Sequence, residues 1–140
     1  MRSKRHDQGT IINYPYRWLH QQESRLDHPK TRPACLLLKI ERPSGAALAL
    51  VAISDFENKA KGACVRVPEA EKARAGLSEF RNAFVHLSEY NIDREKRSLS
   101  YDARAEIRGR FSKPFVAMLA KHLAANIRRG NAAKIDRDQG

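Results

Sequence analysis

An Arg-Pro pair, Arg32-Pro33, stands directly before a strongly apolar run that covers residues 34–40. Proline pushes the residue before it into an extended conformation, and it is tolerated at the first position of a strand because no ladder hydrogen bond is lost there. We therefore expect Arg32 to be held on a rigid element, where a buried strand begins. A core strand does not need a guanidinium at that place, so Arg32 is a candidate for chemistry.

Ser54 ends a second apolar run, residues 46–54, and Pro43-Ser44-Gly45 can turn the chain between the two runs. The two runs are therefore predicted to form a hairpin. In an antiparallel pair, the first residue of one strand and the last residue of the next lie at the same end of the sheet. Arg32 and Ser54 are thus predicted to face one another. A planar cation beside a hydroxyl suits a phosphodiester.

The elements that must position this pair can be read from periodicity and from helix signals. Besides the two runs above, short strands are predicted at 10–14, 63–67, 83–88 and 97–101. Pro68 opens a short helix that Gly76 ends, and Ser112 can cap a C-terminal helix over about 113–129. The stripe that this last helix buries is predicted to be Phe115, Leu119, Leu123 and Ile127. Together these elements predict an α+β fold, a small antiparallel β-barrel of about five to seven strands with a short helix and a C-terminal helix.

Length and charge are consistent with one domain that meets a polyanion or an acidic partner. The chain has 140 residues and a net charge of +11, of which residues 34–93 carry none. We expect a single domain over 10–129, between a flexible basic N-terminus (1–9) and a flexible tail (130–140). The two cysteines have no metal-type spacing and are expected to be reduced, and no apolar run is long enough to span a bilayer. A soluble cytoplasmic protein without a metal is expected.

Four stretches, in this order, resemble the MazF/PemK-type toxins, which are small ribonucleases of bacterial toxin–antitoxin pairs. They are GTIINYPYRW at 9–18, TRPACLLL at 31–38, LVAIS at 50–54 and LSEYNID at 87–93. The resemblance covers about residues 9–129, and it rests on the order and spacing of the four stretches together. Ser54 stands where threonine is usual in the family, and Asn91 stands where an arginine often precedes the Ile-Asp pair.

The resemblance implies an SH3-like barrel, usually a homodimer, that cleaves single-stranded RNA without a metal or other cofactor and is inhibited by an acidic antitoxin. It also implies that Arg32 and Ser54 are the functional residues. Such cleavage uses the 2′-OH as nucleophile, and it needs a general base and stabilisation of a charged phosphorane. Arg32 suits stabilisation rather than proton transfer, because a guanidinium keeps its proton in proteins. The sequence leaves four candidates for the base: His20, His28, Asp55 and Glu89.

The segment 15–31 is the candidate RNA-binding loop, because it mixes aromatic rings, which could stack on bases, with cations that could bind phosphate. The candidates are Tyr16, Arg17, Trp18, Arg25 and Lys30. Tyr16 and Trp18 could instead cover the edge of the core. His86 lies on the same face of a predicted strand as Phe84 and is expected to be structural. Two other function classes stay open: a non-catalytic nucleic-acid-binding module on the same barrel, and a protein-interaction domain whose charge serves an acidic partner.

Overall fold

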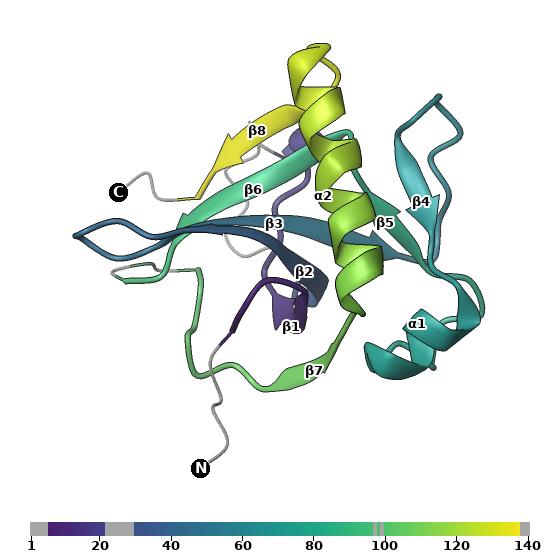
Figure 1. Ribbon diagram of the computed structural model, residues 1–140, viewed down its shortest axis with the longest axis horizontal. Coiled ribbons are helices and arrows are strands. Elements are labelled where there is room, and N and C mark those ends of the chain that lie inside the picture. The colour runs from purple at the N-terminus through teal and green to yellow at the C-terminus, as the bar shows by residue number, and fades with distance from the viewer. Residues whose placement is uncertain (1–5, 22–29, 97, 99, 138–140) are drawn as a thin grey trace.

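The computed structural model of the chain describes residues 6–21, 30–96, 98 and 100–137, and its elements are labelled in Figure 1. They form eight strands, two α-helices and one short 3-10 turn within these residues. The strands and helices are β1 (Thr10–Tyr14), η1 (Leu19–Gln21), β2 (Arg32–Ile40), β3 (Ala47–Ser54), β4 (Cys64–Arg66), α1 (Glu69–Arg74), β5 (Phe84–His86), β6 (Glu89–Arg94), β7 (Ile107–Arg110), α2 (Lys113–Arg128) and β8 (Ala133–Asp136).

The strands form one mainly antiparallel sheet with β3 at its centre. The strand order is β4-β5-β3-β2-β1-β7, and β6 pairs with β3 and with β8. One edge of β3 pairs with β2, whereas the other pairs first with β6, through residues 47–50, and then with β5, through residues 53–54. Within the described residues β4 and β7 do not pair, so the sheet is open where the sequence predicted a barrel. The α+β class and the antiparallel hairpin are confirmed.

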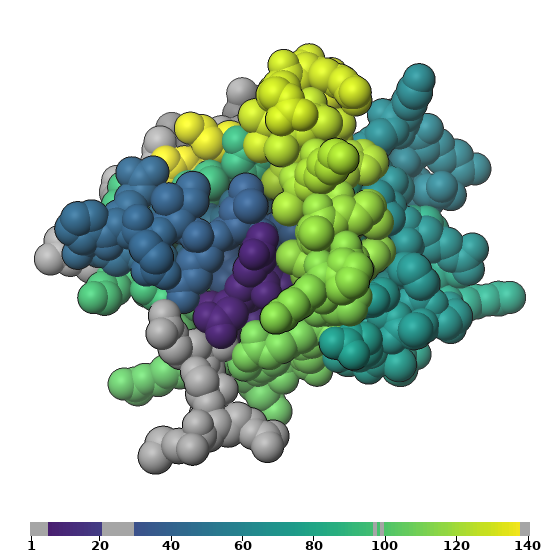
Figure 2. Space-filling view, in the orientation of Figure 1, coloured from purple at the N-terminus to yellow at the C-terminus, as the bar shows by residue number. Residues whose placement is uncertain are grey.

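The middle residues of β2 and β3 are apolar, and both faces of these strands are covered. Alternate residues of one strand contribute to two different cores, as Cys35 and Leu37 do on one face and Ala34 and Leu36 on the other. Figure 1 shows α2 lying across the sheet, and Figure 2 shows the N-terminal strand region packed between this helix and the β2–β3 hairpin. The first core therefore lies between the sheet and α2, and the second lies on the opposite face.

Helix α2 begins as its sequence predicts and differs only in its last turn. The Ser112 hydroxyl accepts a hydrogen bond from the backbone N–H of Phe115 at 3.4 Å. The predicted buried stripe is confirmed for three of its members, but the fourth, Ile127, is 39 % exposed. Asn126 is buried in its place, and its amide donates to the carbonyls of Gly62 and Leu87 at 3.0 and 2.9 Å. The helix thus ends by satisfying carbonyls of neighbouring chain segments rather than by packing apolar surface.

The last third of the sheet differs from the prediction. The described residues 98, 100 and 101 lie outside any strand, and the strand that follows is β7, which pairs with β1. The predicted flexible tail contains β8, which pairs in parallel with β6. Both β7 and β8 are four-residue segments whose partners lie far away in the sequence, so local periodicity does not reveal them.

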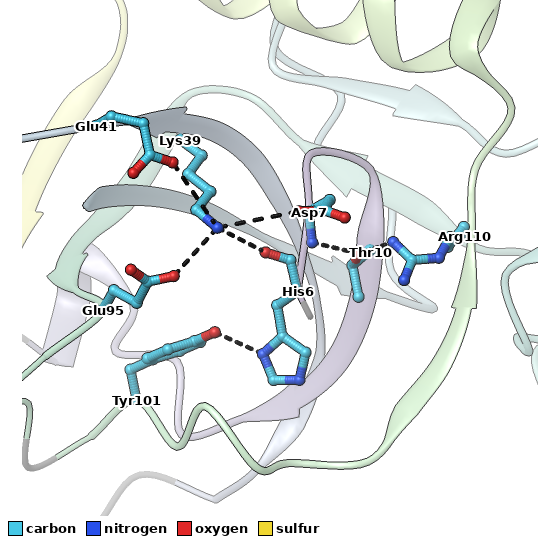
Figure 3. A network of polar contacts seen from close by, with 8 residues as sticks. All are labelled: His6, Asp7, Thr10, Lys39, Glu41, Glu95, Tyr101 and Arg110. Carbon is cyan, nitrogen blue, oxygen red and sulfur yellow. Dashed lines mark hydrogen bonds and ion pairs between the residues drawn. The ribbon is translucent and has the colours of Figure 1, made fainter. Parts of the chain in front are cut away.

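The end of the N-terminal segment is packed rather than loose over residues 6–9, in contrast to the expectation for 1–9. His6 is buried and lies within hydrogen-bond distance of the Tyr101 hydroxyl, at 2.5 Å. Figure 3 shows the polar network around it, in which the Lys39 ammonium contacts the carboxylates of Glu95, Glu41 and Asp7. No helix in the described part of the chain combines the length and the apolar character that crossing a bilayer requires.

Candidate functional site

Arg32 and Ser54 line one cavity at the end of the β2–β3 hairpin. The hairpin register pairs Ala34 with Ala52, and continuing it by two residues sets Arg32 opposite Ser54. The cavity has a volume of about 390 Å³. Residues of four strands and their adjoining segments line it: Trp18, His20, Arg32, Ser54, Asp55, Phe56, Asn58, His86, Ser88 and Glu89.

The pairing of β3 with β5 brings His86 to Ser54. Ser54 pairs with Phe84 of β5, and His86 lies two residues further along that strand, so both side chains face the same side of the sheet. His86 Nε2 lies 2.7 Å from Ser54 Oγ. The backbone N–H of Phe56 also donates to Ser54 Oγ, at 3.3 Å. A serine hydroxyl at the end of a buried strand is therefore held between a backbone donor and an imidazole.

His86 is a neutral, buried imidazole at neutral pH. It is 2 % exposed, and its ring lies 5.1 Å from the ring centroids of both Trp18 and Phe56. Burial lowers the pKa of His86, and the nearby charge of Arg32 lowers it further, to about 4. The sequence predicted a structural role for His86. Alternation along β5 does not reveal that the end of this strand adjoins Ser54.

Among the described residues, the guanidinium of Arg32 has no carboxylate partner. Its Cζ lies 5.2 Å from the centroid of the Trp18 ring, a cation–π arrangement. Its Nε atom is buried without a hydrogen-bond partner, and no ion pair joins Arg32 to any acidic residue in the described part of the chain. A buried donor without a partner is costly. The Arg32 side chain also lines the cavity, so its charge faces that space without an acidic partner among the described residues.

The segment that carries Trp18 is fixed by two polar residues of β6. The Asn91 side chain accepts a hydrogen bond from the Arg17 N–H at 2.9 Å and donates to the Arg17 carbonyl at 2.8 Å. Glu89 accepts from the backbone N–H of Leu19 at 2.9 Å and from the Tyr16 hydroxyl at 3.1 Å. Burial raises the pKa of Glu89 despite these bonds. Asn91 thus has a structural role, because it fixes the backbone at Arg17.

The predicted RNA-binding residues separate into three groups. Tyr16 is fully buried and Trp18 is 7 % exposed, so Tyr16 is not available to stack on a base and little of the Trp18 ring is available. Lys30 is exposed but does not line the cavity, and Arg17 likewise lies outside its lining. Arg25 and the base candidate His28 lie outside the described residues. The sequence analysis missed Phe56, which lines the cavity with 55 % of its surface exposed.

Three of the four candidate bases line the cavity: His20, Asp55 and Glu89. Among the described residues, no group of three histidine, cysteine or acidic side chains is placed to hold a metal ion. The cavity therefore offers an unpaired cation, a strand-end hydroxyl, a neutral imidazole and an exposed aromatic ring. No protein-family model matches the chain, and no curated protein sequence matches it significantly.

Proposed function

We propose that the protein is a metal-independent endoribonuclease that cleaves single-stranded RNA by attack of a 2′-OH on the adjacent phosphorus, as the resemblance to MazF/PemK-type toxins implies. The observation that carries the proposal is the unpaired Arg32 guanidinium beside Ser54 in one cavity. A planar cation with a free donor matches a phosphodiester, and it can stabilise the additional charge of the phosphorane. A purely structural arginine would be expected to have a carboxylate or carbonyl partner.

Single-stranded RNA is the substrate class that the rest of the cavity favours. Phe56 presents an exposed ring beside Arg32, and stacking of an unpaired base on an aromatic ring is the common way of holding single strands. Bases inside a duplex are already stacked on one another and are not available to such a ring. The net charge of +11 would add sequence-independent attraction for the RNA backbone.

The proposal includes the partners and setting that the resemblance implies. These are a homodimer with SH3-like barrels, located in the cytoplasm, and an acidic antitoxin that covers the cavity and inhibits growth arrest by the toxin. The basic charge of the chain supports an acidic partner. The hairpin of β2 and β3, with β3 pairing to two successive strands along its other edge, supplies the bend that a barrel of this kind needs.

The test is incubation of the purified protein with mixed-sequence single-stranded RNA in EDTA. We expect cleavage products that carry a 2′,3′-cyclic phosphate, because the 2′-oxygen remains bonded to phosphorus. Replacing the 2′-OH at the scissile nucleotide by hydrogen should abolish cleavage, which serves as the matched substrate control. Binding of RNA without cleavage, or cleavage of an all-DNA strand, would contradict the proposal.

A further inference from the structure

The contact between Ser54 and His86 is the feature of the cavity that anion binding by Arg32 does not explain. The Ser54 hydroxyl has two possible acceptors: His86 Nε2 at 2.7 Å and the carbonyl of Phe56 at 3.3 Å. The shorter contact is to His86, and the Phe56 N–H occupies another side of the oxygen. Donation of the hydroxyl hydrogen to the imidazole requires the tautomer with the ring hydrogen on Nδ1, and we assign this tautomer from the shorter of the two contacts.

A buried histidine with a satisfied hydrogen bond is often only a core residue. Here three observations favour chemistry: Ser54 lies on the cavity wall, its neighbour there is the unpaired Arg32, and the imidazole behind it holds an acceptor nitrogen. A serine activated by a base behind it is the arrangement that proton-transfer sites use.

We propose that His86 receives, through Ser54, the proton that the attacking 2′-OH loses; this inference rests on the proposed function. The 2′-OH proton moves to Ser54 Oγ while the Ser54 proton moves to His86 Nε2. The 2′-oxygen forms a bond to phosphorus, and the bond from phosphorus to the 5′-oxygen breaks. The 5′-oxygen leaves with the electron pair and takes a proton from water, and the resulting hydroxide takes the proton from His86. Arg32 holds the charged phosphoryl oxygens throughout.

The charges around His86 make this transfer dependent on substrate. The titratable groups that line the cavity with it are Arg32 from β2, His20 from η1, Asp55 after β3 and Glu89 from β6. In the free protein burial and the Arg32 charge disfavour an imidazolium, as the lowered pKa of His86 indicates. A phosphodiester bound at Arg32 brings a negative charge that offsets this repulsion. The imidazole thus stays unprotonated until substrate arrives and becomes a better proton acceptor afterwards.

The candidate bases chosen from the sequence are less well placed. Glu89 already accepts hydrogen bonds from the Leu19 N–H and the Tyr16 hydroxyl through its Oε1 atom, and these bonds hold the Trp18 segment. His20 is exposed and stacks near Trp18, with ring centroids 6.3 Å apart. Neither group has a described hydrogen bond to Ser54, whereas His86 has.

The experiment compares single-turnover cleavage by the native protein, His86→Gln, Ser54→Ala and the double variant. Glutamine can still hydrogen-bond to the Ser54 hydroxyl, but it cannot carry the proton. We expect each single variant to lose about 10² or more in rate, the range in which general-base catalysis contributes. We expect the double variant to be no slower than the slower single variant, because the two groups act as one path. His122→Gln, a histidine on α2 bonded to the Gly62 carbonyl, is the matched control and should cleave like the native protein.

The pH profile supplies a readout that a purely structural histidine would not move. In the native protein the inflection of kcat, which reports the complex, should lie at higher pH than that of kcat/KM, which reports the free protein. Independently of any variant, the imidazole resonance of His86 in the native protein should titrate at higher pH when a 2′-O-methyl oligoribonucleotide is bound.

Cleavage by a folded His86→Gln within about threefold of the native rate would overturn the inference and leave the proposed ribonuclease function standing. An unchanged His86 titration in the presence of the bound oligonucleotide would overturn it in the same way, whether or not the variants fold. Absence of any cleavage by the native protein would overturn the proposed function and the inference together. The three failures are therefore distinguishable.

Discussion

The two cations of strand β2, Arg32 at its first residue and Lys39 near its end, have opposite surroundings. The Lys39 ammonium lies 3.1 Å from the carboxylate of Glu95 and 4.0 Å from those of Glu41 and Asp7, as Figure 3 shows. The Arg32 guanidinium has no acidic partner in the described part of the chain. Seven residues along one strand thus separate a neutralised cation from an uncompensated one.

The comparison shows how a structural cation can be distinguished from a functional one in a basic protein. The Lys39 side chain is 8 % exposed, and its neutralisation fits a structural role, joining the N-terminal segment to the hairpin. Arg32 instead directs its field into a cavity, where it lowers the pKa of His86 after the larger effect of burial. Leaving a cation uncompensated costs stability, and a protein retains such groups where a ligand supplies the missing charge.

The largest expected effect is on RNA cleavage, with Arg32→Met and Lys39→Met as the matched pair. Methionine keeps an unbranched apolar stem and removes the charge in both variants. We expect Arg32→Met to cleave about 10²–10³ times more slowly than the native protein, because one preorganised donor to the transition state is lost. Lys39→Met should cleave within about threefold of the native rate. Equal losses in both variants would show that only overall charge matters.

The next effect concerns the free energy of unfolding, and here the order of the two variants reverses. Lys39→Met removes the ion pair between Lys39 and Glu95, so we expect the free energy of unfolding to fall by about 1–3 kcal/mol. Arg32→Met removes a buried donor that has no partner together with the cation–π contact to Trp18, so we expect its free energy of unfolding to fall by less than that of Lys39→Met. Urea denaturation followed by circular dichroism measures both. A larger loss for Arg32→Met would mean that its guanidinium is structural.

The smallest expected effect is an electrostatic change in the pKa of His86. Arg32→Met should raise the pKa of His86 while leaving it below its ordinary value, because burial is the larger cause of the lowering. Lys39→Met should leave that pKa unchanged, since the carboxylates around Lys39 screen its charge. NMR titration of the imidazole resonances measures both shifts. A fall in the pKa of His86 in Arg32→Met would contradict the predicted rise.

A histidine with a lowered pKa also makes stability depend on pH with a definite sign. Between the ordinary histidine pKa of about 6.5 and the folded value of about 4, the unfolded chain binds a proton at this residue that the folded chain excludes. The contribution of His86 is therefore fully present above about 6.5 and is lost as the pH falls through this window.

The sequence predicted the β2–β3 hairpin and the proximity of Arg32 and Ser54 that results from it, because both depend on local signals. The Arg-Pro pair, the turn at 43–45 and the two apolar runs are enough to place Arg32 and Ser54 at one end of the sheet. The capping by Ser112 and most of the buried stripe of α2 follow from equally local patterns.

What the sequence could not predict depends on contacts between distant segments. His86 reaches Ser54 only because β3 changes partner from β6 to β5 along one edge, and no pattern within β5 records that change. The burial of Tyr16 depends on Glu89, 73 residues away. The strand β8 forms because β6 offers it a free edge, although its own sequence reads as a polar tail.

The most direct measurement of the central claim is an NMR titration of the native protein with a 2′-O-methyl oligoribonucleotide, which can bind but cannot be cleaved. It is followed at the arginine Nε–H and lysine Nζ resonances. We predict that the Arg32 Nε–H resonance shifts strongly as a phosphodiester binds the guanidinium, while the Lys39 resonance does not move. Binding of the oligonucleotide with Arg32 unchanged, or with Lys39 shifted instead, would contradict the account.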